Sequence, residues 1–384
     1  MDVRITALMP SQQILRNLDQ VTNQILQDQT EIATGKVLTQ PSDNPAAVTQ
    51  DLLTQQVQSQ VTAWQNVAGS ALAIAQATDQ ALTQIEQAAT NAYATALSAV
   101  GPTGTAGRGA VIQELQQIQQ SVGQLANTKV GDIYLFGGDS GQPPWSPSSP
   151  GMLVGGPAMM VNVGSELSVP QNMAANTTPN GGPVGDLLAA LQGVITALQA
   201  PQVGQTYTVN IQFNYGSSTY TTTTSYTTTS PPTTITASPP AGAPPGPPTS
   251  ITAVFEIPTS AGNVEVADIP IPLSDFSGGV VSFTGPTWGE IASAAAGLVQ
   301  QAQANLVGAH AAFGTDMQRI EAAQAALSTQ ATALQSTRAS LESAKIPNVV
   351  ADLANQEATY QAVLQSASNV ILPSLATYLG RYGP

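Results

Sequence analysis

Apolar residues at heptad spacing occur at both ends of this 384-residue chain, and this pattern constrains the fold more than any other feature. Residues at that spacing form one stripe along a helix, and such a stripe needs a helical partner. The simplest partner for one terminal helix is the other, so we predict that the two ends pair. The N-terminal stripe, which is interrupted only at Asp28, and the C-terminal stripe comprise Ile14, Leu18, Val21, Ile25 and Ile32, and Val349, Leu353, Tyr360, Val363 and Val370.

Charged residues make up only 8% of the chain, whereas soluble domains usually carry about 25%. The net charge is −14, which argues against nucleic acid as a partner because phosphate contacts require clustered Lys and Arg. The sequence contains no Lys or Arg between Lys129 and Arg319. This shift in composition marks the middle of the chain as an inserted domain.

The residue types that support catalysis are scarce. The absence of cysteine removes disulfides, thiolate metal sites and cysteine nucleophiles. His310 is the only histidine and lies in an Ala-rich helical stretch, so we expect a surface or seam position for it and not a catalytic role. Carboxylates are scattered singly, without a calcium or two-carboxylate cluster. We therefore expect no enzyme activity, no metal and no cofactor.

The first fifteen residues lack the basic flank, apolar core and small-residue cleavage site of a secretory signal. No stretch is apolar enough for a membrane span. We expect no cleaved signal and no membrane insertion. The composition suits a cytoplasmic protein, or one exported by a route that reads no cleaved signal.

Two further helices are predicted in the first third of the chain. The first begins at a corner, where Asp43 or Asn44 can serve as N-cap and Pro45 suits the first helical position. It continues to about Ala99 in an unbroken apolar register. After a Gly-rich turn, the second forms a helical hairpin with it and ends near Gly131.

A last helical stretch is predicted from Trp288 to the C-terminus, with breaks at Pro347 and Pro373. Its apolar residues recur at every seventh position, which favours a long stripe. These residues are Leu306, Phe313, Ile320, Leu327, Leu334 and Leu341.

The middle of the chain contains Pro, Gly and short β-branched or aromatic runs, which favour antiparallel strands. We expect the helix 184–200 to pack on the helical body and not inside the sheet. Residues 220–248 are rich in Thr and Pro and are predicted to form a hairpin that leads to an extended mobile loop. The predicted strands of this region are 159–163, 207–213, 251–255 and 280–283. A further strand is predicted at 133–136, where the chain leaves the helical body.

The predicted fold is mainly α with a β-rich insertion. The N- and C-terminal segments form a long helical hairpin or coiled-coil rod, and an antiparallel β domain is inserted at its tip. The predicted domains are 1–40 with 346–384 for the terminal assembly helices, 41–140 with 288–345 for the helical rod, and 141–287 for the β-rich insertion.

Short motifs near both ends occur in a recognisable order. They contain Gly35, Lys36, Pro41, Ser42, Asp43, Asn44 and Pro45, then Phe136, Gly137 and Gly138, and finally Gly314, Arg319 and Glu321. Together they resemble the flagellin superfamily, and within it the hook-associated proteins of the FlgL type, which join the hook to the filament. The resemblance covers roughly the first 140 and last 95 residues. The Pro-Ser-Asp-Asn-Pro corner and the Phe-Gly-Gly motif favour the junction type over filament flagellin.

The resemblance implies a non-enzymatic, extracellular structural adaptor in the bacterial flagellum. It implies export through the flagellar type III apparatus, with a chaperone on the C-terminal helix. Subunits would form a ring between the hook-side associated protein and flagellin. The stripe residues listed above, with Leu375, would pack between subunits in the assembled state. The terminal helices could stay disordered until neighbours complete their seams.

Three alternatives remain open. A filament flagellin would share both ends but polymerise without limit. Residues 141–287 could instead be an extracellular carbohydrate-binding or hydrolytic module carried on flagellin-like ends. A cytoplasmic coiled-coil scaffold would use the heptads but leaves the β insertion unexplained.

Overall fold

The computed structural model describes residues 3–38, 44–100, 105–175, 177–201, 203–259 and 262–379. The chain divides into two compact units, Met1–Ala63 with Ala326–Pro384, and Trp64–Ala325. Helix α2 (Pro45–Val100) and helix α5 (Trp288–Glu342) are each divided between the two units. The mainly α fold with a β-rich middle is confirmed. The division into three domains stays a prediction.

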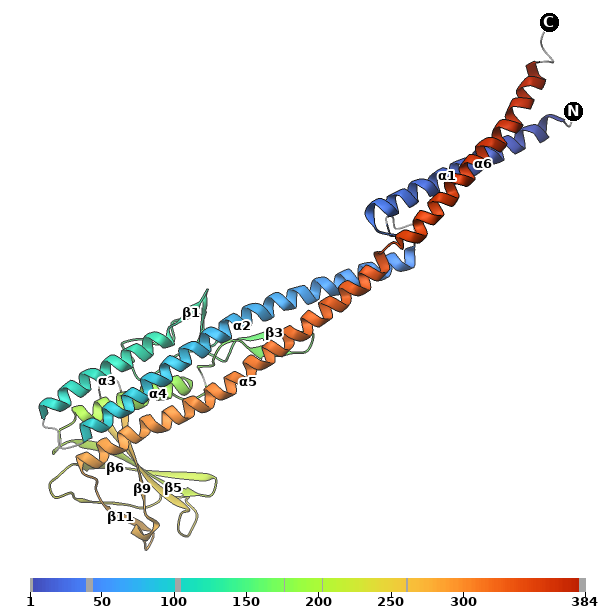
Figure 1. The fold of residues 1–384 in the computed structure, drawn as a ribbon. Coiled ribbons are helices and arrows are strands. Elements are labelled where there is room, and N and C mark those ends of the chain that lie inside the picture. The colour runs from blue at the N-terminus through green and yellow to red at the C-terminus, as the bar shows by residue number, and fades with distance from the viewer. Residues whose placement is uncertain are drawn as a thin grey trace. The chain divides into compact units, whose positions relative to one another are not determined.

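The first unit is built on the two terminal helices. Helix α1 (Val3–Thr34) and helix α6 (Ile346–Leu379) lie side by side, as Figure 1 shows. A single β-bridge between Lys36 and Ser343 lies at the end of α1 and just before α6, so the two helices run in opposite directions. The prediction that the two ends of the chain pair is therefore confirmed.

The two predicted proline breaks have different outcomes. Helix α5 ends at Glu342 and α6 begins at Ile346, so the break precedes Pro347. Proline suits the first turn of a helix because the N–H that it lacks has no partner there. The predicted break at Pro373 is wrong, since α6 continues to Leu379. A proline inside a helix removes one hydrogen bond, and here the turns on both sides keep the helix continuous.

The second unit has a helical layer in which α2 and α5 lie close together and α3 (Thr105–Ala126) packs on α4 (Gly182–Gln199). The predicted seam of α2 is buried from Ala68 to Ala96, and its many alanines allow close approach of helix backbones. The buried seam residues are Ala68, Ala71, Ala75, Thr78, Leu82, Ile85, Ala89, Ala92 and Ala96 on α2, and Ile291, Ala295, Val299, Leu306, Phe313 and Ile320 on α5.

The main sheet is antiparallel with the order β6-β5-β8-β9. Its strands are β5 (Thr206–Tyr215), β6 (Ser218–Thr227), β8 (Ser250–Thr259) and β9 (Gly262–Ile271). Alternate residues of β5 are fully buried, including Tyr207 and Phe213, while the residues between them are polar. This alternation places one face of the sheet in the core and the other in water.

The Thr/Pro-rich segment 220–248 is more ordered than predicted. Most of β6 lies within it and pairs along its full length with β5, and β7 (Thr234–Ala237) joins a second small sheet. Thr has a high β propensity, and Tyr226 in β6 is 3% exposed, so this strand has its own anchor in the core. The predicted hairpin agrees with the pairing of β6 with β5, whereas the prediction of an extended mobile loop is wrong for β7.

The remaining elements are short. β7 pairs with β11, which also pairs with β10, and the two-stranded ribbons are β1 with β2 and β3 with β4. Their bounds are β1 (Lys129–Val130), β2 (Ile133–Tyr134), β3 (Met160–Asn162), β4 (Ser168–Pro170), the 3-10 helix η1 (Leu273–Asp275), β10 (Phe276–Ser277) and β11 (Val280–Thr284).

Helix α4 connects the helical layer to the main sheet. It packs on α3, as predicted, and also on β9, which the sequence did not predict. The close approach to β9 depends on Gly193, where a Cβ atom would lie 2.5 Å from the backbone oxygen of Glu265. Only glycine leaves room for the strand at this point of α4.

We expect Gly193→Ala to destabilise the protein. The added methyl group must displace the backbone of β9, which costs roughly 1–3 kcal/mol of unfolding free energy. Gly297→Ala in α5 is the matched control, because a Cβ there meets open space and alanine favours the helix by about 1 kcal/mol. Denaturant unfolding of both variants measures the difference, and equal stability of the two would contradict the packing described.

Candidate assembly surfaces

The predicted seam between the terminal helices is used within the chain. Ile14, Leu18, Val21, Ile25, Ile32, Leu353, Tyr360 and Val363 are half-buried, and Val349 is buried. The side chains of Val370 and Leu375 lie outside the described residues. The remaining exposure of these side chains shows that one helix partner does not cover the seam fully. That they pack between subunits stays a prediction.

Each terminal helix also carries a second apolar row that is exposed. Leu15 and Leu26 on α1 are 59% and 55% exposed, and Val350 and Leu364 on α6 are 48% and 44% exposed. The members of each pair are separated by whole turns, eleven residues on α1 and fourteen on α6, so each pair lies on one face. The residues between the two members of a pair are mostly polar, so each row offers a neighbouring helix two separate apolar contact points.

The corner after α1 is fixed by backbone contacts to the end of α5. Gly35 adopts a left-handed conformation with φ of 69°, which glycine tolerates without strain. The Val37 N–H donates to the Glu342 carbonyl at 2.8 Å, and the Ala344 N–H donates to the Gly35 carbonyl at 2.9 Å. The motif residues Gly35 and Lys36 therefore hold the chain at this corner.

An ionic network surrounds the same corner. Glu342 accepts from Lys36 Nζ at 2.7 Å with one carboxylate oxygen and from Arg338 Nε at 2.7 Å with the other. Arg338 also contacts Asp51 of α2 at 3.0 Å. The hydrogen bond from Lys36, and then the charges of Arg338 and Lys36, lower the pKa of Glu342 against the opposing effect of burial. Glu342 therefore stays ionised and links three segments of the first unit.

The corner motif continues at the start of α2. The Asn44 side chain accepts a hydrogen bond from the Ala47 N–H at 3.1 Å, and α2 begins at Pro45. Asn44 is thus the N-cap, as one of the two predicted candidates. Pro41, Ser42 and Asp43 lie outside the described residues.

The Phe136–Gly138 motif forms a buried turn and not a continuous strand. Phe136 is 2% exposed, and Gly138 has φ of 60° and lies against the backbone of Gly156. The Asn172 side chain donates to the Tyr134 carbonyl at 2.9 Å and to the Gly138 carbonyl at 2.8 Å. The predicted strand 133–136 therefore ends at Tyr134. Sequence reasoning did not single out Asn172, whose amide organises this turn.

The last motif lies along α5. Gly314 leaves open space beside the helix, Arg319 forms an ion pair with Asp316 at 3.0 Å, and Glu321 is exposed. Arg319 and Glu321 face water and are available to a neighbouring chain. The structure does not bring these residues together with the other two motifs into one catalytic cluster.

His310 joins α5 to α2 in the second unit. Its Nδ1 lies 2.8 Å from Glu86 Oε1, and its Nε2 lies 2.8 Å from Asp79 Oδ1. Both ring nitrogens can donate only in the imidazolium form, so the two carboxylates favour the charged histidine. Its side chain is 20% exposed, which agrees with the predicted seam or surface position.

The environment of His310 favours its charged state. Burial lowers the pKa of His310, but the hydrogen bonds to Asp79 and Glu86, together with their charges, raise it above its ordinary value of 6.5. The two carboxylates lie at opposite ring nitrogens and so do not converge on one cation. Within the described residues, no group of three His, Cys, Asp or Glu side chains could hold a metal.

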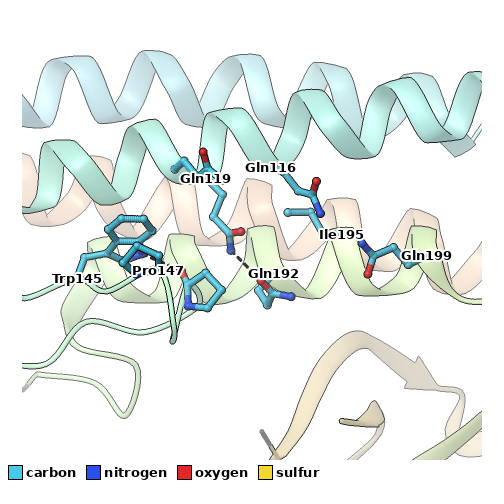
Figure 2. Close-up of a pocket in the computed structure, with 9 residues that line it drawn as sticks. Gln116, Gln119, Trp145, Pro147, Gln192, Ile195 and Gln199 are labelled. Carbon is cyan, nitrogen blue, oxygen red and sulfur yellow. Dashed lines mark hydrogen bonds between the residues drawn. The ribbon is translucent and has the colours of Figure 1, made fainter. Parts of the chain in front are cut away.

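A groove of about 390 Å³ lies between α3, α4 and the loop that connects β2 to β3. As Figure 2 shows, Gln119 of α3 points toward Gln192 of α4, and its amide nitrogen donates to Gln192 Oε1 at 3.2 Å. Gln119 also donates to the Leu188 carbonyl at 3.2 Å. The lining residues are Gln116, Gln119, Gln120, Trp145, Pro147, Pro150, Gln192, Ile195 and Gln199.

The chemistry of this groove is limited. None of its nine lining residues is ionisable, so it contains no pair of carboxylates for glycoside hydrolysis. Trp145 is 6% exposed because its indole packs on Gly123, and it offers no open ring face for stacking. The groove therefore gives no support to a hydrolytic module.

The N-terminal part of the chain is similar to a known protein family. Residues 5–140 match the family model of the bacterial flagellin N-terminal helical region. Over these residues the chain is similar to the flagellins. This match includes α1, the corner at Gly35 and α2, which together carry most of the N-terminal motifs.

One solved structure shares the fold of this chain, and two others are similar to it at lower TM-scores. The first, provisionally named a flagellar hook-associated protein from Vibrio parahaemolyticus, has a TM-score of 0.51 and 13% identity, covering 78% of this chain and 100% of that one. FlgL from Xanthomonas campestris has 16% identity and a TM-score of 0.41, and the match covers 73% of this chain and 99% of that one. A flagellar hook-associated protein from Legionella pneumophila has 16% identity and a TM-score of 0.44, and the match covers 75% of this chain and 98% of that one.

The search of curated proteins finds no match to this chain. None of the helices in its described part is long and apolar enough to cross a membrane.

We expect His310→Gln to destabilise the protein by roughly 1–3 kcal/mol below pH 6.5, because it removes two charge-assisted hydrogen bonds. A raised pKa means that the contribution of His310 is complete below pH 6.5 and is lost as pH rises through the folded-state pKa. Unfolding of wild type and variant across this range measures the effect.

The matched control is Gln303→Ala, which removes a neutral hydrogen bond from α5 to Thr90 of α2. Its loss of stability should not depend on pH. If the His310→Gln difference stayed constant up to alkaline pH, the imidazolium bridge would be excluded.

Proposed function

We propose that this chain is the subunit that joins the flagellar hook to the filament. The observation that carries the proposal is the flagellin N-terminal match over residues 5–140, combined with pairing of the two terminal helices. The Pro-Ser-Asp-Asn-Pro corner and the Phe-Gly-Gly turn favour the junction type within that superfamily. The role is mechanical and non-enzymatic.

The mode of assembly follows from the exposed apolar rows. In a single chain, Leu15 and Leu26 on α1 and Val350 and Leu364 on α6 remain open to water. Covering one such side chain fully contributes about 1.5–3 kcal/mol, so a neighbouring helix would stabilise the terminal pair considerably. Self-assembly through the terminal helices is therefore the mechanism that we infer.

The partners follow from the proposed position. A junction subunit has a hook-side associated protein on one side and flagellin on the other, with further copies of itself in a ring. Reaching that position requires export through the flagellar type III apparatus, with a chaperone on α6 before assembly. The protein would then be extracellular. The lack of cysteine suits passage of an unfolded chain through a channel, since no disulfide can form on the way.

A filament flagellin is the second candidate, because the family match covers a region that flagellins share. It would use the same terminal helices but polymerise without limit. The two candidates differ in where the protein lies along the flagellum and in how many copies each flagellum contains.

Immunogold labelling of isolated flagella, with an antibody against residues 141–287, separates these candidates. We expect one cluster of gold particles at the hook end. Labelling along the whole filament would identify a flagellin, and absence of label from both hook and filament would exclude the flagellar assignment. An isogenic strain that lacks the gene controls for antibody specificity.

The double variant Leu15→Gln and Leu26→Gln tests the assembly surface. Both side chains are exposed in the single chain, so we expect helical content within about 10% of wild type by circular dichroism, since exposed substitutions change stability little. Incorporation into flagella should be lost, because the apolar row no longer matches a neighbour. Asn23→Gln, at an exposed polar position of α1, should incorporate normally. Normal incorporation of the double variant would show that this row is not an interface.

A further inference from the structure

Two polar residues interrupt the apolar seams of α1 and α6 at equivalent positions. On α1 the seam advances by alternating steps of three and four residues, and Asp28 takes the position between Ile25 and Ile32. On α6, Gln356 takes the position between Leu353 and Tyr360. Seam positions in paired helices are normally apolar, so each interruption disfavours burial unless the two polar groups satisfy each other.

The structure brings these two interruptions together. The Gln356 side chain lies beside the Asp28 carboxyl group and acts on its pKa as a hydrogen-bond donor. The alignment is imposed from the corner, where the Lys36–Ser343 bridge and the ionic contact of Lys36 with Glu342 hold the end of α1 beside the start of α6. With that end fixed, antiparallel helices place Asp28 opposite Gln356.

One oxygen of each group has no partner. Asp28 Oδ2 and Gln356 Oε1 are both buried, and neither has a hydrogen-bond donor. With Asp28 ionised, both atoms can only accept, so neither can satisfy the other. A buried acceptor without a donor costs roughly 1–3 kcal/mol, and more when it carries charge. Because these two acceptors belong to side chains that contact each other, we infer that a donor hydrogen is missing between them.

A proton on Asp28 supplies this hydrogen. We propose that Asp28 is a neutral carboxylic acid in the folded chain and forms a reciprocal pair with Gln356. In this pair the amide N–H donates to one carboxyl oxygen of Asp28, and the O–H of the other carboxyl oxygen donates to Gln356 Oε1. The proton comes from solvent when the helices pair. Pairing of α1 with α6 is then stronger in acid than in alkali.

The electrostatic surroundings favour the same protonation state. Burial first, and then the negative charge of Asp352 on α6, raise the pKa of Asp28 above its ordinary value of 3.8, although the Gln356 hydrogen bond lowers it. On α1 itself, Glu31 lies one turn further along and is another acidic group. The cations of the corner, Lys36 and Arg338, are held by Glu342. The charged groups that face Asp28 are thus acidic.

The direction of the pH dependence follows from the raised pKa. The folded chain holds the Asp28 proton more tightly than the unfolded chain, so folding takes up a proton in the range between the two pKa values. The stability of the α1–α6 pair is highest below pH 3.8 and falls as pH rises through the folded-state pKa. Above that pKa the two buried acceptors have no donor, and the pair opens more often.

The test compares Asp28→Asn with wild type in the full-length chain. Asparagine keeps a reciprocal amide pair with Gln356 but has no titrating group. Hydrogen exchange of peptides within residues 12–38, measured by mass spectrometry and corrected for intrinsic rates, reports opening of the α1–α6 pair. We expect equal protection below pH 3.8, and then a protection advantage for Asp28→Asn that grows by up to about tenfold per pH unit until the folded-state pKa is passed.

The matched control is Asp19→Asn, which changes an exposed carboxylate on the same helix and should leave the ratio to wild type constant. Titration of the Asp28 carboxyl carbon by ¹³C NMR, assigned by its loss in Asp28→Asn, gives a second readout. A protection ratio independent of pH, lower protection of Asp28→Asn throughout, or titration of Asp28 at or below 3.8 would overturn the proposal. The proposal concerns pairing within the chain and does not depend on the flagellar position.

Discussion

The structure depends on one constraint, which is that the helices from the two halves of the chain must cover each other's apolar stripes. Neither α1 nor α6 can bury its stripe alone, and in the second unit the same holds for α2 and α5. An isolated amphipathic helix gains little stability in water, since most helical stability in proteins comes from packing of the apolar face. Residues from opposite ends of the sequence therefore become ordered together.

The two seams are covered to different degrees. In the second unit, the α2 seam from Ala68 to Ala96 is almost completely buried within one chain. The seam between the terminal helices remains half-buried, and both helices keep further apolar side chains in water. The second unit therefore has a fully covered core, whereas the seam of the first unit is a surface that further helices can cover. This contrast gives the proposed assembly a physical basis in the first unit, independent of any relative.

The helices could be predicted from sequence because a period of seven is visible without knowledge of the fold. The strands were harder. β5 alternates polar and apolar residues and was predicted. β6 consists mainly of Thr, with Ser and two Tyr residues, and its hydropathy does not alternate clearly, so its bounds follow only from its pairing with β5. β9 was missed because it contains acidic residues, a proline and a register shift opposite Phe255 and Glu256, all of which obscure a period of two.

The contacts that decide alignment were not predictable, because they join residues far apart in sequence. Arg338 meets Asp51 across 287 positions, and His310 meets Glu86 across 224. Only 8% of the chain is charged, so a misaligned helix pair has few alternative ionic partners. Surface ion pairs contribute little stability on average. An ion pair still favours one alignment of the helices when every other alignment would leave its carboxylates unpaired. In this chain, the few charges therefore mainly determine which segments pair, while burial of apolar side chains supplies the stability of each pair.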